Sequence, residues 1–210
     1  MTEIYNVINY PPSNIKKMKF YMNPEGLNEY YFTQFRELKS IELVNYNFLY
    51  PINPLVNDII IHDIPGYAFQ NCTKLESVKI SAGFNNVGVG AFRGCINLKE
   101  ITFSDGLVEI GNSAFFGCVK LNKINLPDSI TDIGVNAFMY CDNLKKITLP
   151  RNLRKISSDL FFECDNIKEW RAAIDKLKIP INRENLAKQA LSDFTSYTWK
   201  KRAKNVTLLN

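Results

Sequence analysis

The most reactive side chains of this sequence are five cysteines at a constant interval of 23 residues: Cys72, Cys95, Cys118, Cys141 and Cys164. Thiolates act as nucleophiles and metal ligands, but structural zinc sites use closely spaced C-x-x-C pairs, which this sequence lacks. The interval predicts a column of thiols in a repeat protein, each packed as a small apolar side chain. A disulfide between neighbouring coils is the alternative, although the odd number of cysteines argues against it.

The sequence contains a single histidine, His62, which lies beside Asp63 and close to Asp58. A His–Asp pair can orient a general base, but no nucleophile accompanies it, because the cysteines are expected to face inward. The phosphate-binding, dinucleotide-binding and zinc-protease motifs are also missing from the sequence. We therefore expect His62 to be a surface residue, and we expect no enzyme activity, no metal site and no cofactor.

The same interval governs the apolar residues around each cysteine. Around Cys118, for example, apolar residues stand three positions before it and three and six positions after it, at Phe115, Leu121 and Ile124. Apolar and polar residues alternate from Ile124 to Leu126, which predicts a short strand with one buried face. Strands of successive coils are expected to stack about 4.8 Å apart in a parallel sheet. Each coil then buries its apolar edge against its neighbours.

The repeat continues upstream of the first cysteine. An apolar triplet recurs after 23 residues, with Ile15, Met18 and Phe20 followed by Leu38, Ile41 and Leu43. The interval from Phe35 to Cys72 is 37 residues, and we interpret Asn45 to Asp58 as an insertion because this segment breaks the pattern and carries two prolines. The intervals predict about seven coils in a solenoid domain over residues 1–170.

Three further features recur in each coil. A second apolar pair, such as Ile130 and Ile133, is expected to line the opposite wall of the coil. Glycines recur at one place, at Gly88, Gly111 and Gly134, which predicts a backbone with positive φ. Ser113, Asn136 or Asp159 stands just before Ala-Phe or Leu-Phe, and such residues predict the cap of one helical turn.

The unit that carries these features resembles the BspA-type leucine-rich repeat, also called the Treponema-type repeat. The resemblance rests on the pattern Ile133-Gly134-x-x-Ala137-Phe138-x-x-Cys141-x-Asn143-Leu144-x-x-Ile147-x-Leu149-Pro150. About nine positions of this pattern match in each of four units. The resemblance covers residues 64–170 well and residues 12–63 loosely.

With the repeat pattern, this resemblance implies a leucine-rich repeat solenoid. It is expected to be a right-handed coil of about seven 23-residue repeats, with a parallel β-sheet on one face and a C-terminal helical cap. Bacterial members of the family are often surface adhesins. The implied function is a non-enzymatic module for protein–protein interaction or adhesion that presents a repeat surface to a protein ligand. The alternative is a structural or assembly protein, a homo-oligomer or accessory subunit joined through its insertion or C-terminal helix.

Two surfaces are candidates for binding that ligand. In the resembled family the sheet forms the concave wall, and its outward residues here carry five Lys against two Glu. The candidates on this wall are Lys79, Glu100, Thr102, Lys123, Asn125, Lys146 and Thr148. They form either a mildly basic binding strip or an ordinary solvated face. The insertion offers aromatic anchors at Tyr46, Phe48 and Tyr50, for interaction, dimerisation or capping of the core.

Residues 171–210 depart from the repeat and are predicted to form a basic helical cap. Asn182 follows Pro180 as a helix cap, and Leu186, Ala190 and Phe194 make one apolar stripe that would cover the end of the core. Positive charge is concentrated near the end of this segment at Lys200, Lys201, Arg202 and Lys204. These residues either bind an acidic partner or complement a helix C-terminus, and nucleic acid is not the expected ligand.

The sequence and the family resemblance give different expectations for the cellular compartment of the protein. No run approaches the roughly 20 apolar residues needed to span a bilayer, and the sequence from Met1 onward does not begin like a secretory signal. The default expectation is therefore a cytoplasmic protein. The family resemblance instead allows a location at the cell surface.

Overall fold

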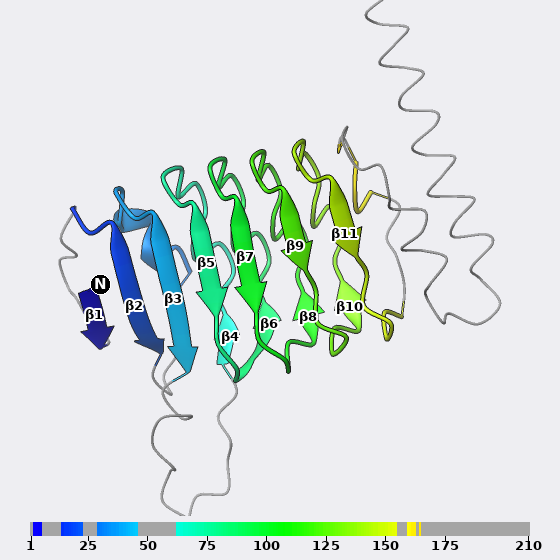
Figure 1. Cartoon of the computed structure of the whole chain (residues 1–210), viewed down its shortest axis with the longest axis horizontal. Coiled ribbons are helices and arrows are strands. Elements are labelled where there is room, and N and C mark those ends of the chain that lie inside the picture. The colour runs from blue at the N-terminus through cyan, green and yellow to red at the C-terminus, as the bar shows by residue number, and fades with distance from the viewer. Residues whose placement is uncertain are drawn as a thin grey trace, which may run out of the picture.

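The computed structural model describes residues 2–5, 14–22, 29–45, 62–154, 159–162 and 164 of the 210-residue chain. Its strands run parallel in two sheets, one of seven strands and one of four (Figure 1). The described residues form a parallel β-solenoid of about five turns, with a repeat of about 23 residues. The insertion aromatics Tyr46, Phe48 and Tyr50 and the predicted cap at 171–210 lie outside the described residues.

The seven-stranded sheet has the order β1-β2-β3-β5-β7-β9-β11. These strands are β1 (Thr2–Tyr5), β2 (Lys17–Met22), β3 (Ser40–Asn45), β5 (Ser77–Ile80), β7 (Glu100–Phe103), β9 (Lys123–Asn125) and β11 (Lys146–Thr148). In β9, Ile124 is buried between the exposed Lys123 and Asn125. The alternation read from the sequence is therefore confirmed in β9, because one face of this strand turns toward the core.

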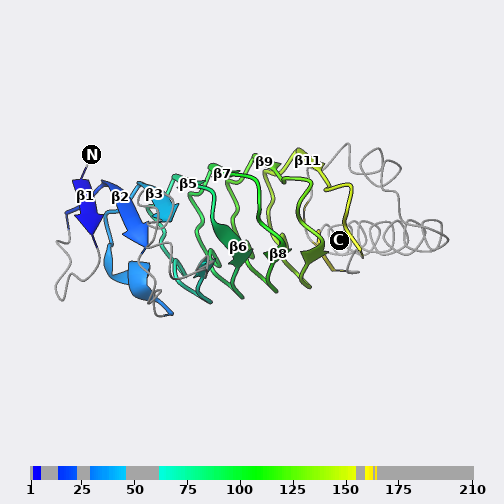
Figure 2. The same cartoon turned by 90° about the horizontal axis from the view of Figure 1, so that it is seen from below.

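The four-stranded sheet forms the opposite wall of the coil, as Figure 2 shows. Its strands are β4 (His62–Ile64), β6 (Phe84–Val87), β8 (Glu109–Ile110) and β10 (Asp132–Ile133). Ile110 and Ile133 are buried there, and so are Leu107 and Ile130 just before them. The predicted role of this second apolar pair is confirmed. The apolar core lies between the two sheets.

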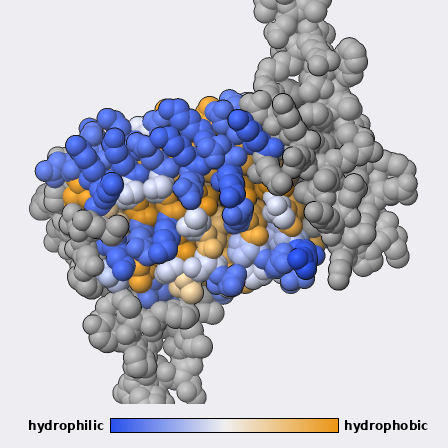
Figure 3. Space-filling view, viewed as in Figure 1, coloured by the Kyte–Doolittle hydropathy of each residue, from blue (hydrophilic) through white to orange (hydrophobic). Residues whose placement is uncertain are grey.

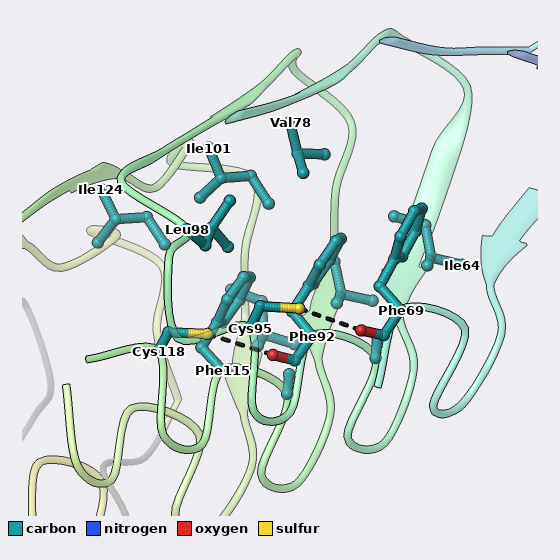
Figure 4. Close-up of a cluster of buried hydrophobic side chains, with 14 of the residues drawn as sticks. Ile64, Phe69, Val78, Phe92, Cys95, Leu98, Ile101, Phe115, Cys118 and Ile124 are labelled. Atoms are coloured by element: carbon teal, nitrogen blue, oxygen red, sulfur yellow. Dashed lines mark hydrogen bonds between the residues drawn. The ribbon is translucent and has the colours of Figure 1, made fainter. Parts of the chain in front are cut away.

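A column of phenylalanine rings runs along this core (Figure 4). The rings of Phe32, Phe69, Phe92, Phe115 and Phe138 are fully buried or nearly so. Successive ring centroids lie 4.2, 4.9, 5.3 and 5.4 Å apart, with interplanar angles of 10° or less. This separation is close to the distance of about 4.8 Å between neighbouring strands, so the rings stack wherever the backbones do.

The five cysteines lie beside the phenylalanine column as free, buried thiols. Each Sγ donates a hydrogen bond to the carbonyl oxygen of the phenylalanine in the preceding coil, as the dashed lines of Figure 4 mark for Cys95 and Cys118. The Sγ–O distance is 3.0 Å from Cys95 to Phe69 and 3.2 Å from Cys118 to Phe92. The thiols therefore do more than fill space, because they satisfy carbonyl groups between coils.

The recurring glycines correct one prediction. Gly88, Gly111 and Gly134 are not among the residues with positive φ. A Cβ atom on Gly88 would instead lie 2.5 Å from the backbone nitrogen of Gly66, and one on Gly134 would lie 2.4 Å from that of Asn112. Glycine is required because the backbones of successive coils approach too closely for any side chain.

The segment before each cysteine corrects a second prediction. Ser113 and Asn136 have φ of 55° and 58°, so they adopt the left-handed conformation and not the extended one of a helix cap. Hydrogen-bonded turns follow them, as from the Cys118 N–H to the Phe115 carbonyl at 3.1 Å. Among the described residues, helix occurs only in the 3-10 turn η1 (Tyr31–Gln34). A left-handed residue redirects the chain without a full helical turn.

The start of the insertion also differs from the prediction. Asn45 is the last residue of β3 and is buried to 1% exposure. Its side-chain Nδ2 donates a hydrogen bond to the Gly83 carbonyl at 2.7 Å. Asn45 thus belongs to the coil, and the insertion begins after it. A polar residue interrupts the apolar pattern in the sequence and so suggests a loop. Here the side-chain amide of Asn45 is instead hydrogen-bonded to the next coil.

We expect Cys118→Ala to lower the free energy of unfolding by about 1–3 kcal/mol, since it removes a buried atom and a hydrogen bond to Phe92. Cys72→Ala should cost less, because Cys72 is 7% exposed and its Sγ lies 3.5 Å from the Phe32 carbonyl. Urea denaturation of both variants measures the difference. A loss below about 0.5 kcal/mol for Cys118→Ala would show that its thiol contributes little.

Candidate functional site

The outward residues of the seven-stranded sheet form two columns, which we call the sheet strip. In the first column, strand pairing places in register Lys17, Ser40, Ser77, Glu100, Lys123 and Lys146. The second column contains Lys19, Glu42, Lys79 and Thr102, followed by Asn125 and Thr148 in β9 and β11. The strip therefore gathers the sheet candidates predicted from the sequence, including Lys79, Glu100, Thr102, Lys123, Asn125, Lys146 and Thr148.

Three lysines of the middle coils, Lys39, Lys79 and Lys99, are paired with glutamates of neighbouring coils. Lys79 Nζ lies 2.7 Å from Glu42 Oε1 across the strip. Along the adjoining edge, Glu76 lies between Lys39 at 3.6 Å and Lys99 at 2.8 Å. The hydrogen bond from Lys99, together with its positive charge, holds the pKa of Glu76 below its usual value. Charge is therefore locally balanced in these coils.

Three lysines farther toward the C-terminal end of this face have no such partner among the described residues. Lys120, Lys123 and Lys145 are exposed, and we call them the basic surface. Within the described ranges, no carboxylate forms an ion pair with any of the three, although Glu100 is the register neighbour of Lys123. Lys120 Nζ donates instead to the amide oxygen of Asn97 at 2.6 Å. Positive charge is therefore uncompensated here.

The register strengthens this imbalance. Lys123 in β9 pairs with Lys146 in β11, which brings two lysine positions side by side as predicted. Like charges on directly neighbouring strands repel each other, and an anionic ligand would relieve the repulsion. Figure 3 shows hydrophilic residues gathered along the upper edge of this face, where the chain enters the strands. The three side chains of the basic surface are exposed.

The reactive residues of the sequence are poorly placed for chemistry. Burial raises the pKa of the Cys72 thiol to about 12, and burial also raises the pKa values of Cys95, Cys118 and Cys141. These groups stay protonated at neutral pH, and a protonated buried thiol is a poor nucleophile and ligand. In the part of the chain that the structure describes, no group of three or more His, Cys, Asp or Glu residues is placed to hold a metal ion.

One surface feature was missed by the sequence reasoning. Arg93 and Phe116 stand two positions before their cysteines, and Tyr140 stands one position before Cys141; all three are partly exposed. The guanidinium carbon of Arg93 lies 4.0 Å from the centre of the Phe116 ring, and this ring contacts Tyr140 edge-on at 5.2 Å. We call these three residues the turn patch. Its signal in the sequence was a run of large side chains on the outward side of the turn.

Short parallel strands stacked at a fixed period, with the same apolar residues buried in every coil, define a leucine-rich repeat solenoid. The family model described as the BspA type Leucine rich repeat region matches residues 62–198 in six copies. The chain belongs to this family. The resemblance read from the sequence is confirmed.

Solved structures of bacterial leucine-rich repeat proteins are similar to this chain. A Bacteroides ovatus protein is 25% identical with a TM-score of 0.51, over 72% of this chain and 38% of its own. A leucine rich cell surface protein of Faecalibacterium prausnitzii is 20% identical with a TM-score of 0.55, over 84% and 55%. A T. pallidum leucine rich repeat protein is 26% identical with a TM-score of 0.44, over 61% and 66%. The chain thus matches less than two thirds of each.

Two further findings are negative. No match was found among curated proteins. Among the described residues, no helix is both long enough and apolar enough to cross a membrane. Leucine-rich repeat proteins typically act as protein-interaction or adhesion modules, and no particular ligand follows from the family.

We expect the free energy of unfolding to fall as the pH rises from about 9 toward 12. Thiols in the unfolded chain ionise near their ordinary pKa of 9.0, whereas burial keeps Cys72 protonated up to about 12. The stabilisation is complete below pH 9 and is lost as the pH rises through the folded-state pKa, by at most about 1.4 kcal/mol per pH unit for each thiol.

Urea denaturation at pH 8 and pH 10.5 measures this loss for the parent protein and for Cys72→Ala. The lysines and tyrosines that also titrate in this range are common to both proteins, so their contributions cancel in the comparison. Cys72→Ala should lose less stability between the two pH values. Equal losses would contradict the raised pKa of Cys72.

Proposed function

We propose that this protein is a non-enzymatic module for protein–protein interaction or adhesion, and that a protein ligand contacts the basic surface, where the sheet strip meets the adjoining edge. One observation carries the proposal: Lys120, Lys123 and Lys145 are exposed on one edge and face of the solenoid without a carboxylate partner in the described residues. Membership of the BspA-type family supports a binding role and favours adhesion at a cell surface over the default cytoplasmic location.

The contrast along the solenoid indicates which part of the strip contacts the ligand. Lys79 is neutralised by Glu42 and Lys99 by Glu76, so these two lysines offer little net charge to a partner. The basic surface offers exposed positive charge, and electrostatic complementarity increases association rates and selects against wrong partners. We infer that the ligand presents a negatively charged face to the coils around β9 and β11.

The alternative function is assembly, either as a homo-oligomer or as an accessory subunit. It relies on the insertion aromatics Tyr46, Phe48 and Tyr50 and on the segment 171–210, which lie outside the described residues. Native mass spectrometry of the whole chain separates the two functions. A concentration-independent monomer disfavours homo-oligomer assembly and leaves the binding module as the better account.

The double variant Lys123→Glu/Lys145→Glu should lose capture of a protein ligand from a cell lysate or from purified extracellular matrix proteins. The matched control is Lys16→Glu/Arg36→Glu, which changes two exposed basic residues of the N-terminal coils and lowers the formal charge of +5 by the same amount. Capture by the parent should also weaken as salt rises, because exposed charges are screened beyond about 8 Å at physiological ionic strength.

Retention by the control and loss by the double variant would support the basic surface as the binding site. Equal loss by both would indicate attraction by net charge alone, and retention by both would contradict the proposed site. A deletion of 46–58 tests the insertion separately. Its left boundary follows Asn45, whose side chain belongs to the coil.

A further inference from the structure

The turn patch is a second surface with the composition of a binding site. It lies in the turns that precede Cys95, Cys118 and Cys141, whereas the sheet strip lies on the outward face of the strands. Phe116 contacts the Tyr140 ring at an interplanar angle of 78°. Arginine and tyrosine are enriched among the residues that dominate binding energy at protein interfaces. The sheet strip, by contrast, carries lysines, Glu100 and small polar residues over β5 to β11.

Arg93 is held in place but leaves its hydrogen-bond donors available. Its guanidinium carbon lies 4.0 Å from the centre of the Phe116 ring, a distance typical of a cation–π contact. No described residue accepts a hydrogen bond from this side chain or forms an ion pair with it. A guanidinium that stacks through its face keeps its edge free, and that edge matches a carboxylate in a two-pronged hydrogen bond.

Tyr140 occupies a position that disfavours its side chain. Its φ is 59°, in the left-handed region where bulky residues are rare. At the same place, two preceding coils carry Gly94 and Gly117, with φ of 74° and 72°, and the coil before them carries Asn71 with φ of 57°. A large aromatic residue where glycine suffices for the turn indicates a role for the ring itself.

We propose that the turn patch binds a protein segment that presents a carboxylate next to an apolar side chain. The carboxylate accepts hydrogen bonds from Arg93, and the apolar side chain covers the exposed parts of Phe116 and Tyr140. The match between a fixed cation and an anionic group gives the site its selectivity, while the two rings supply the apolar contact. This site is separate from the proposed sheet strip, so a ligand can be tested at each one alone.

The test uses the full chain and two sets of synthetic heptapeptides, followed by fluorescence polarisation. In the first set a central Glu or Asp is flanked by Leu or Trp, and in the second set Gln or Asn replaces the acid. The first set should bind at least tenfold more tightly. Arg93→Gln should remove this preference, and Arg93→Lys should restore only part of it, because lysine lacks the planar fork.

Tyr140→Gly distinguishes a binding role from a structural one. Glycine suits a positive φ, so the variant should keep or raise the melting temperature while peptide affinity falls about tenfold. Lys16→Glu, at an exposed residue outside both proposed sites, serves as the control and should leave peptide binding unchanged. Equal binding of the acidic and amide peptides would overturn the proposal. So would a lower melting temperature with unchanged affinity for Tyr140→Gly, which is the result expected if the ring only packs coils together.

Discussion

Adjacent coils approach so closely that a Cβ atom on Gly88 or Gly111 would lie 2.5 or 2.8 Å from a backbone nitrogen of the preceding coil. This approach fixes the distance between coils, and the other contacts depend on that distance. Phe92 and Phe115 stack at 5.3 Å, and the Cys118 thiol reaches the Phe92 carbonyl at 3.2 Å. No coil buries its apolar edge alone, so the stack is stable only as neighbouring coils together.

The same distance determines what the surface can do. Outward side chains of successive coils fall into columns, so a charge or a ring at one position is placed beside its equivalent in the next coil. Glu76 between Lys39 and Lys99 shows the balanced outcome. Lys123 beside Lys146 shows the unbalanced one. The binding properties of such a fold are therefore determined by the outward side chains, which differ between coils while the core residues repeat.

The period made most of the fold predictable from the sequence. The sheet register follows from it directly, so the sequence correctly predicted that Lys123 and Lys146 lie side by side. Contacts between coils were harder to predict. The period shows that a residue recurs, but it does not show which contact requires that residue. Gly88 recurs for close approach and not for a positive φ, and Asn45 looked like part of a loop although its amide is bonded within the stack. The turn patch was missed for a related reason, since Phe116 occupies an outward position that is not constant and carries Gln70, Arg93 or Met139 in other coils.

Two features that oppose folding lie in the same few coils. Lys123 and Lys146 are like charges in register, and Tyr140 holds a left-handed backbone conformation that glycine adopts in the preceding coils. In the preceding coils the positions equivalent to Lys123 and Tyr140 carry Glu100 and Gly117, although Tyr30 and Tyr67 adopt the left-handed conformation at another place in the turns of earlier coils. A repeat stack tolerates local costs because the coils on either side hold the unfavourable residues in place. Residues that oppose folding are expected where binding depends on them, and the coils around β9 and β11 carry such residues on both the strand and the turn side.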